Sequence, residues 1–193
     1  MTPANLLTSG NLAAGFVALV LVAQGELVWA AGLVGAAAIF DALDGVVARH
    51  AHCEGAFGSR LDSLADLVSF GMAPTLLLYV GGLRELPVAG IGACLAFVLC
   101  GGWRLARFSL VESRFHFVGL PIPPAGVVAA VLAITSVPPA IVCPVTAVGA
   151  ALMVSPVPFP TLAAIARFLR ARPPERALAA APEPAKPAAR SVR

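Results

Sequence analysis

The sequence predicts an all-α integral membrane protein, built as a bundle of six transmembrane helices. Of its 193 residues 59% are hydrophobic and only 12% are charged, with a mean hydropathy of +0.90, whereas a soluble domain carries about 25% charged residues. The apolar residues are also gathered into long runs, and an α-helix needs about 20 of them to cross a bilayer. The six runs are 5–24, 27–48, 61–80, 88–105, 125–137 with its flanks, and 140–155.

Basic residues orient these six runs. If the amino terminus is cytoplasmic, every Lys and Arg except Arg84 lies in an inner loop or in the carboxy-terminal tail. The positive-inside rule therefore predicts a multi-pass protein of the cell (inner) membrane with both termini in the cytoplasm. The fifth and sixth runs are the least well separated, because Pro138 and Pro139 leave little room for a turn. The net charge of +3 offers no basic surface for nucleic acid.

Polar residues mark the inner ends of the first and fourth runs. Asn5, Thr8 and Asn11 recur at helical spacing in the first run, and Arg104 and Arg107 lie at the end of the fourth. Each group has two interpretations. The first group either hydrogen-bonds a nucleotide or holds helices together. The arginines either bind a substrate carboxylate or phosphate, or anchor their helix at the inner surface.

Four aspartates concentrate where the second run ends and the third begins. Asp41 and Asp44 are three residues apart, and Asp62 and Asp66 are four apart, so each pair lies on one face of its helix. The loop between the two helices contains glycines that let the chain return antiparallel. All four carboxylates are therefore predicted to converge at the cytoplasmic edge of the bilayer.

Converging carboxylates at membrane depth must be relieved of their repulsion by protons or by cations. Oxygen-only ligands favour hard divalent ions such as Mg²⁺ or Mn²⁺, and magnesium commonly completes its shell with water and a substrate phosphate. Gly45 and Ala48 leave room beside the acids, and Arg49 has a guanidinium suited to phosphate. The ordinary alternative, a salt-bridged rim at a helix end, is disfavoured by the presence of two acid pairs on consecutive helices.

The carboxy-terminal segment divides into two parts after the predicted bundle, 1–155. Segment 156–172 is expected to contain either a short amphipathic helix lying on the membrane surface or a continuation of the last span. Segment 173–193 is rich in Pro, Ala and charge and is predicted to be a disordered tail.

The spacing of the acids also carries a family resemblance. The stretch from Asp41 to Asp66 reads D-x2-D-G-x2-A-R-x8-G-x3-D-x3-D without a mismatch. This resembles the signature of the CDP-alcohol phosphatidyltransferases, membrane enzymes with six transmembrane helices that displace CMP from a CDP-linked lipid with an alcohol. The resemblance implies their fold and a homodimer. It also implies two bound divalent ions.

The resemblance assigns roles to the matching positions of this chain. Asp41, Asp44 and Asp62 correspond to metal ligands, and Asp66 corresponds to a ligand and the candidate general base. Four further positions correspond to those that accommodate the CDP moiety, and two polar residues of the first run are expected to assist them. The first four are Gly45, Ala48, Arg49 and Gly58, and the other two are Asn5 and Thr8.

Stretches outside the signature are similar to the phosphatidylserine synthases of this family, among them NLLTSGNLAAGF at 5–16 and GLPIPPAG at 119–126. The expected substrates are therefore CDP-diacylglycerol and L-serine, with Arg104 or Arg107 meeting the serine carboxylate or a phosphate. Two alternatives remain open. One is the same chemistry with glycerol 3-phosphate or an inositol phosphate as acceptor, and the other is a non-catalytic membrane protein of the same fold.

Overall fold

The computed structural model describes residues 3–51, 56–110 and 119–155, and these ranges are helical almost throughout. A π-helical segment, η1 (Leu67–Met72), joins α3 to α4 without a break, and a short 3₁₀ turn, η2 (Leu83–Glu85), precedes α5. The α-helices are α1 (Pro3–Ala23), α2 (Leu27–Ala51), α3 (Ala56–Asp66), α4 (Ala73–Gly81), α5 (Pro87–Leu110), α6 (Ile122–Ala133) and α7 (Pro139–Val154). With α3, η1 and α4 taken as one continuous helix, these ranges contain six helices, as predicted. Segments 156–172 and 173–193 lie outside the described residues.

Four of the helices are long and apolar enough to cross a bilayer, namely Asn5–Ala23, Leu27–Gly45, Phe57–Gly81 and Pro87–Arg107. The other two, α6 and α7, are apolar but shorter. The fifth helix was expected to reach residue 137 and ends at Ala133 instead. The chain turns after Ala133, so that Pro138 becomes the N-cap of α7 and Pro139 its first residue. A proline is well tolerated there because the first helical turn has no partner for its N–H.

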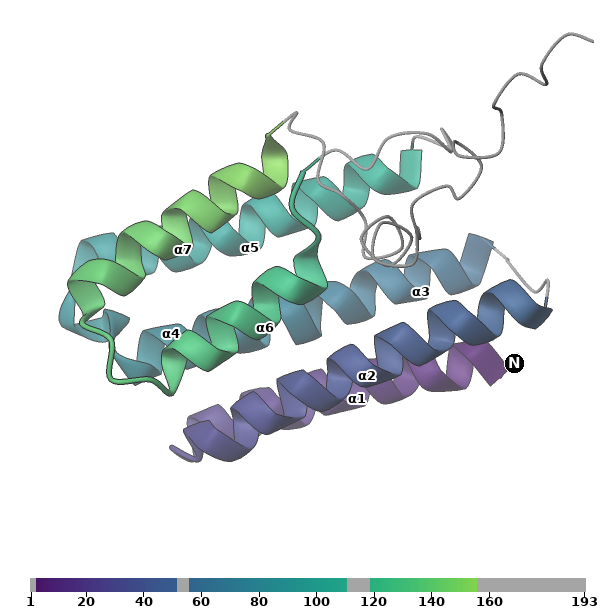
Figure 1. The fold of residues 1–193 in the computed structure, drawn as a ribbon, viewed down its shortest axis with the longest axis horizontal. Coiled ribbons are helices and arrows are strands. Elements are labelled where there is room, and N and C mark those ends of the chain that lie inside the picture. The colour runs from purple at the N-terminus through teal and green to yellow at the C-terminus, as the bar shows by residue number, and fades with distance from the viewer. Residues whose placement is uncertain (1–2, 52–55, 111–118, 156–193) are drawn as a thin grey trace, which may run out of the picture. The chain divides into compact units, whose positions relative to one another are not determined.

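The helices pack in neighbouring pairs (Figure 1). α1 lies along α2, α5 along α7, and α4 along α6, while α1 also contacts α3, η1 and α4. The turn between α1 and α2 is closed by Gly25, which has a φ of 85°. Two hydrogen bonds, from Glu26 N to Leu21 O and from Gly25 N to Val22 O, give this turn the pattern of a Schellman motif. The second helix therefore returns antiparallel beside the first.

The π-helical segment accommodates a proline inside a long helix. Pro74 has no N–H, and in a regular α-helix its ring would clash with the carbonyl of Phe70, four residues earlier. The wider turn just before it relieves this clash, and the N–H of Ala73 bonds Val68 O, five residues back. Thr75 Oγ1 donates to the carbonyls of Gly71 and Met72. The helix thus continues past Pro74, and its wider turn begins immediately after Asp66.

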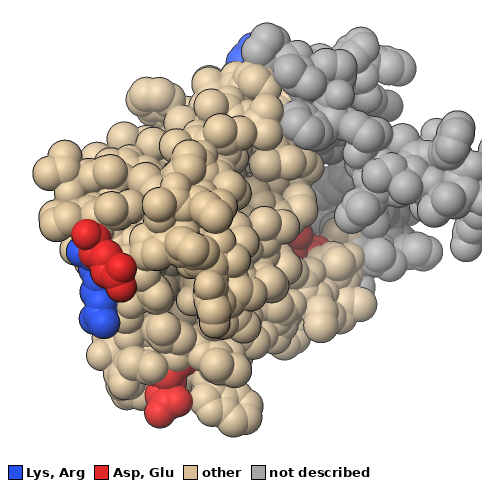
Figure 2. Space-filling model, turned by 60° about the vertical axis from the view of Figure 1, so that its left-hand side comes forward, with Lys and Arg blue, Asp and Glu red and all other residues tan. Residues whose placement is uncertain are grey.

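The outer surface of the bundle is apolar. Trp29, Val88 and Trp103 are 71%, 88% and 65% exposed, as expected of side chains that face lipid. Figure 2 shows one face of the molecule with only a few charged groups on it. The composition of this surface agrees with an integral membrane protein.

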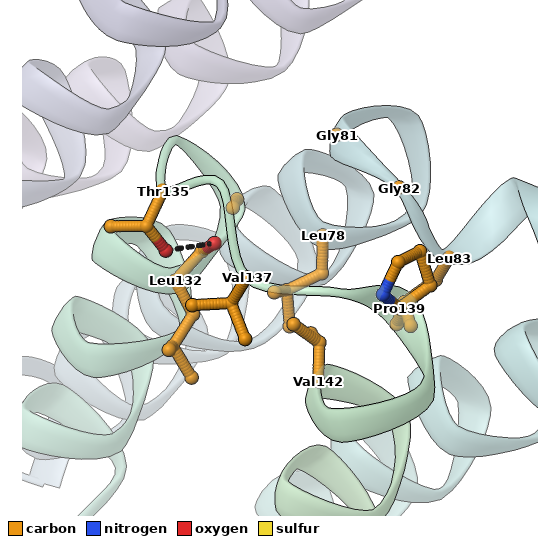
Figure 3. Close-up of a pocket in the computed structure, with 10 residues that line it drawn as sticks. Leu78, Gly81, Gly82, Leu83, Leu132, Thr135, Val137, Pro139 and Val142 are labelled. Atoms are coloured by element: carbon orange, nitrogen blue, oxygen red, sulfur yellow. Dashed lines mark hydrogen bonds between the residues drawn. The ribbon is translucent and has the colours of Figure 1, made fainter.

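A small cavity of about 10 Å³ lies where the end of α4 meets the turn between α6 and α7. Figure 3 shows Thr135 in its wall, where Oγ1 donates a 2.8 Å hydrogen bond to Leu132 O. Gly81 also lines this cavity, and a Cβ there would come 3.3 Å from the carbonyl carbon of Ala133. Gly81 follows Asp66 by fifteen residues, about 20 Å of helix, so this cavity is remote from the acids.

Candidate active site

Three of the predicted acids form one cluster. Asp41 projects from α2, and Asp62 and Asp66 project from α3, and each contributes an oxygen that lies within 4.8 Å of the other two. Asp66 is buried, while Asp41 and Asp62 are partly buried. The predicted convergence of the two acid pairs is therefore confirmed for these three residues. They are named the carboxylate cluster below.

Asp44 lies beside the carboxylate cluster and has a different partner. It is buried, and its Oδ2 accepts a 2.7 Å hydrogen bond from Thr8 Oγ1 on α1. It is not one of the three residues whose oxygens meet within 4.8 Å. It is nevertheless close enough for its charge to act on Asp62 and Asp66. All four carboxylates thus occupy one region, with Asp44 tied to the first helix.

The carboxylate cluster has the composition of a site for hard cations. Two unit charges 4.8 Å apart repel each other by about 3.5 kcal/mol at an effective dielectric constant of about 20. Three such pairs on apolar helices are a large unfavourable term if all the acids are ionised. Divalent cations relieve it, and an all-oxygen ligand set is one that such cations prefer. The residues of this cluster could therefore hold a metal ion.

Helix α1 supports the cluster from one side through Asn11. This side chain is fully buried, and its Nδ2 donates a 3.3 Å hydrogen bond to Asp66 Oδ1. Its main-chain carbonyl accepts a 2.9 Å hydrogen bond from Ser69 Oγ in η1. Gly15, one turn further along α1, allows this approach, because a Cβ there would lie 2.8 Å from the Cα of Ser69. α1 and the π-helical segment are thus in close contact next to Asp66.

The other predicted residues are distributed around the cluster. Asn5 packs against Gly58, where a Cβ would lie 3.1 Å from Asn5 Oδ1. Gly45 directly follows Asp44 and is partly buried. Ala48 and Arg49 lie in α2, but their side chains are outside the described part of the chain.

The two arginines of α5 differ in burial. Arg107 is exposed. Arg104 is partly buried, with the charge of Asp66 close enough to act on its guanidinium. Its Nε is buried and has no hydrogen-bond partner among the residues that the structure describes.

The sequence pattern did not assign a firm role to two residues of the site. Asn11 belonged to a polar stripe with Asn5 and Thr8, but nothing in the stripe indicated which of the three meets Asp66. Ser69 was not predicted at all. The position of Ser69 could have indicated a role in the site. It follows Asp66 by three residues, so it lies on the same helical face as Asp62 and Asp66.

Comparison with known proteins agrees with this site. The model of the family described as CDP-alcohol phosphatidyltransferase matches residues 1–165. A CDP-diacylglycerol–serine O-phosphatidyltransferase of Bacillus subtilis (strain 168) is 35% identical over 157 residues, covering 80% of this chain and 88% of the relative.

Two further relatives carry the same name. The one from Helicobacter pylori (strain J99) is 37% identical over 126 residues, which are 64% of this chain and 53% of the relative. The one from Methanocaldococcus jannaschii is 51% identical over 85 residues, 44% of this chain and 40% of the relative. The chain therefore aligns with about half or less of these two proteins. The matched residues include the acids of α2 and α3, and the chain belongs to the CDP-alcohol phosphatidyltransferase family.

Proposed function

We propose that this protein transfers the phosphatidyl group of CDP-diacylglycerol to the hydroxyl of L-serine, releasing CMP and forming phosphatidylserine. The observation that carries the proposal is the carboxylate cluster, in which oxygens of Asp41, Asp62 and Asp66 lie within 4.8 Å of one another in a chain of membrane-spanning helices. The choice of serine rests on the relatives, one of which is 35% identical over 80% of this chain.

The four aspartates are proposed to hold two divalent cations, Mg²⁺ or Mn²⁺. Oxygens on opposite sides of one Mg²⁺ lie about 4.2 Å apart, so the cluster needs only a small adjustment to share an ion. Asp62 Oδ1 is buried without a hydrogen-bond partner among the described residues, which fits an atom whose partner is a cation. When bound, the cations neutralise the pyrophosphate and the departing CMP.

The chain's own residues then move the proton and orient the acceptor. Asp66 is proposed as the general base: it takes the proton of the serine hydroxyl as that oxygen bonds to phosphorus. The bond between this phosphorus and the oxygen of CMP breaks, and CMP leaves with the electron pair. Asn11 donates a hydrogen bond from its amide to Asp66 Oδ1, which fixes the orientation of the carboxylate that receives the proton.

The remaining proposals concern the surroundings of the reaction. Gly45, Ala48, Arg49 and Gly58 are proposed to line the CDP moiety, with Asn5 and Thr8 beside them. The site and both termini are proposed to face the cytoplasm in the inner membrane, because the basic residues other than Arg84 fall on that side. The protein is further proposed to act as a homodimer.

The proposal is tested by the release of CMP from CDP-diacylglycerol by the purified enzyme with a panel of acceptors. L-serine should give at least about ten-fold faster release than glycerol 3-phosphate or inositol 1-phosphate, roughly the discrimination that one charged contact provides. Faster release with a phosphorylated acceptor would reject serine and retain the family chemistry. No release with any acceptor would favour a non-catalytic protein of this fold.

A further inference from the structure

The side-chain nitrogen of Asn11 has a hydrogen-bond partner, whereas its side-chain oxygen has none among the described residues. Its Nδ2 donates to Asp66 Oδ1, and a carboxylate that accepts this bond fixes which way the amide points. Its Oδ1 is buried and has no hydrogen-bond partner among the described residues. Buried amide oxygens are almost always paired, so an unpaired one beside a site is suited to accept from a donor that arrives with a ligand.

Arg104, on α5, shows the complementary deficiency, and α5 contacts both α3 and η1. Its Nε is also buried without a partner in the part of the chain that the structure describes. The guanidinium is close enough to Asp66 for the two charges to interact. An Nε–H is a donor only, and arginine is the side chain best suited to hold a carboxylate by parallel hydrogen bonds. The unsatisfied donor of Arg104 therefore indicates an anionic acceptor group on the ligand.

We propose that Asn11 and Arg104 form the recognition site for a zwitterionic hydroxy amino acid. Asn11 Oδ1 accepts a hydrogen bond from the ammonium group, Arg104 Nε donates one to the carboxylate, and the side-chain hydroxyl reaches Asp66 between them. This inference rests on the proposed function and specifies how its acceptor is selected. A phosphorylated polyol carries no ammonium for Asn11, and an amino alcohol carries no carboxylate for Arg104.

The surroundings of Asn11 favour a prepared site over a loose one. Asn11 is 0% exposed, and its carbonyl is held by Ser69 Oγ at 2.9 Å, both in the buried contact of α1 with η1. Its amide is held by Asp66. The position of Oδ1 is therefore set before a ligand arrives, and little conformational entropy remains to be lost on binding.

The test compares two fragments of serine as competitive inhibitors. Ethanolamine keeps the ammonium and lacks the carboxylate, and 3-hydroxypropionate keeps the carboxylate and lacks the ammonium. In Arg104→Gln the KM for serine and the Ki for 3-hydroxypropionate should each rise about ten-fold or more, with the Ki for ethanolamine unchanged. In Asn11→Ala the KM for serine and the Ki for ethanolamine should rise, with the Ki for 3-hydroxypropionate unchanged.

Second variants guard against loss of the fold. Arg104→Lys keeps the charge and removes the Nε donor, and Asn11→Ser keeps a small polar side chain without the amide. Each is expected to change the same KM and Ki values as the first variant at its position. Matched controls are Arg84→Gln, an exposed arginine of η2, and Thr146→Val, a buried threonine whose Oγ1 bonds Val142 O of its own helix. Both controls should retain the wild-type KM and Ki values.

The outcomes separate this inference from the proposed function. If the wild-type enzyme releases no CMP with serine, the proposed function fails. If it does, but the variants keep the wild-type KM for serine, the acceptor site lies elsewhere and only this inference fails. A change of both Ki values by the same factor means that Asn11 and Arg104 act structurally, and this result also overturns the inference.

Discussion

Thr8 Oγ1 and Asp44 Oδ2 are joined by a 2.7 Å hydrogen bond that links α1 to α2 across 36 residues of sequence. Both side chains are buried. The bond holds Asp44 from the first helix, while the other three aspartates meet one another. The amino-terminal helix therefore takes part in building the site, through Thr8 on Asp44 and through Asn11 on Asp66.

Removing the Thr8 hydroxyl should weaken both the fold and the site. Thr8→Val keeps the shape and leaves the buried Asp44 carboxylate without this donor, which costs about 1–3 kcal/mol of unfolding free energy. We expect a lower thermal midpoint in detergent and a lower CMP release rate. Thr146→Val is the control, because among the described residues the Thr146 hydroxyl bonds only a carbonyl of its own helix. Equal destabilisation by the two substitutions would contradict a special role for the Thr8 bond.

Chelation should abolish activity if the carboxylate cluster holds divalent cations. We expect CMP release to stop in excess EDTA and to return on addition of Mg²⁺ or Mn²⁺. Asp41→Asn should weaken Mn²⁺ binding, measured by electron paramagnetic resonance, by about ten-fold or more, because one charged ligand is lost. Glu85→Gln, an exposed acid of η2, serves as the control. Full turnover in excess chelator would exclude a metal-dependent mechanism.

The close packing of α1 against η1 predicts that alanine substitutions at two glycines of the bundle have opposite effects on stability. A Cβ at Gly15 would lie 2.8 Å from the Cα of Ser69, whereas a Cβ at Gly32 meets no atom within 4 Å. Gly15→Ala should therefore destabilise the protein by about 1–3 kcal/mol and reduce turnover. Gly32→Ala should be neutral or stabilising by up to about 1 kcal/mol, since alanine favours helix. Thermal midpoints of both variants check this, and a tolerated Gly15→Ala would show that the contact can open.

The distribution of basic residues predicts which side of the membrane the site faces. In a variant without native cysteines, Ser59→Cys in α3 should react with an impermeant thiol reagent only after the cytoplasmic side is opened. Glu85→Cys in η2 should react in intact cells, because η2 follows the opposite end of the helix that begins with α3. Both side chains are exposed. Labelling of Ser59→Cys from outside would reverse the assigned orientation.

Local patterns in the sequence predicted much of this structure, since they need no knowledge of packing. Runs of apolar residues predicted six helices, and the spacing of Asp41, Asp44, Asp62 and Asp66 predicted the face that each acid occupies. The cluster of Asp41 with Asp62 and Asp66 agrees with this prediction. In the structure, α2 and α3 both pack mainly against α1, which brings their acids together.

Features that depend on distant partners were not predictable in the same way. The contact of Ser69 with Asn11 spans 58 residues, and the periodicity of α1 does not say which helix its polar stripe faces. Pro74 stands inside an apolar run, where a kink, a break and a π-helical turn are all physical solutions that the local sequence does not distinguish. In the structure α6 also packs closely against the π-helical turn, since a Cβ at Gly126 would lie 2.6 Å from Phe70 O.

The most direct test of the account is the turnover of Asp66→Asn. The asparagine is nearly isosteric, can still accept the hydrogen bond from Asn11, and cannot take the acceptor's proton. At a Mn²⁺ concentration high enough to offset the loss of one charged ligand, we predict that the variant binds CDP-diacylglycerol with a Kd within a few-fold of wild type. CMP release with L-serine should still fall by a factor on the order of 10² or more. Turnover close to that of the wild type would show that Asp66 is not the base, and the central claim would be wrong.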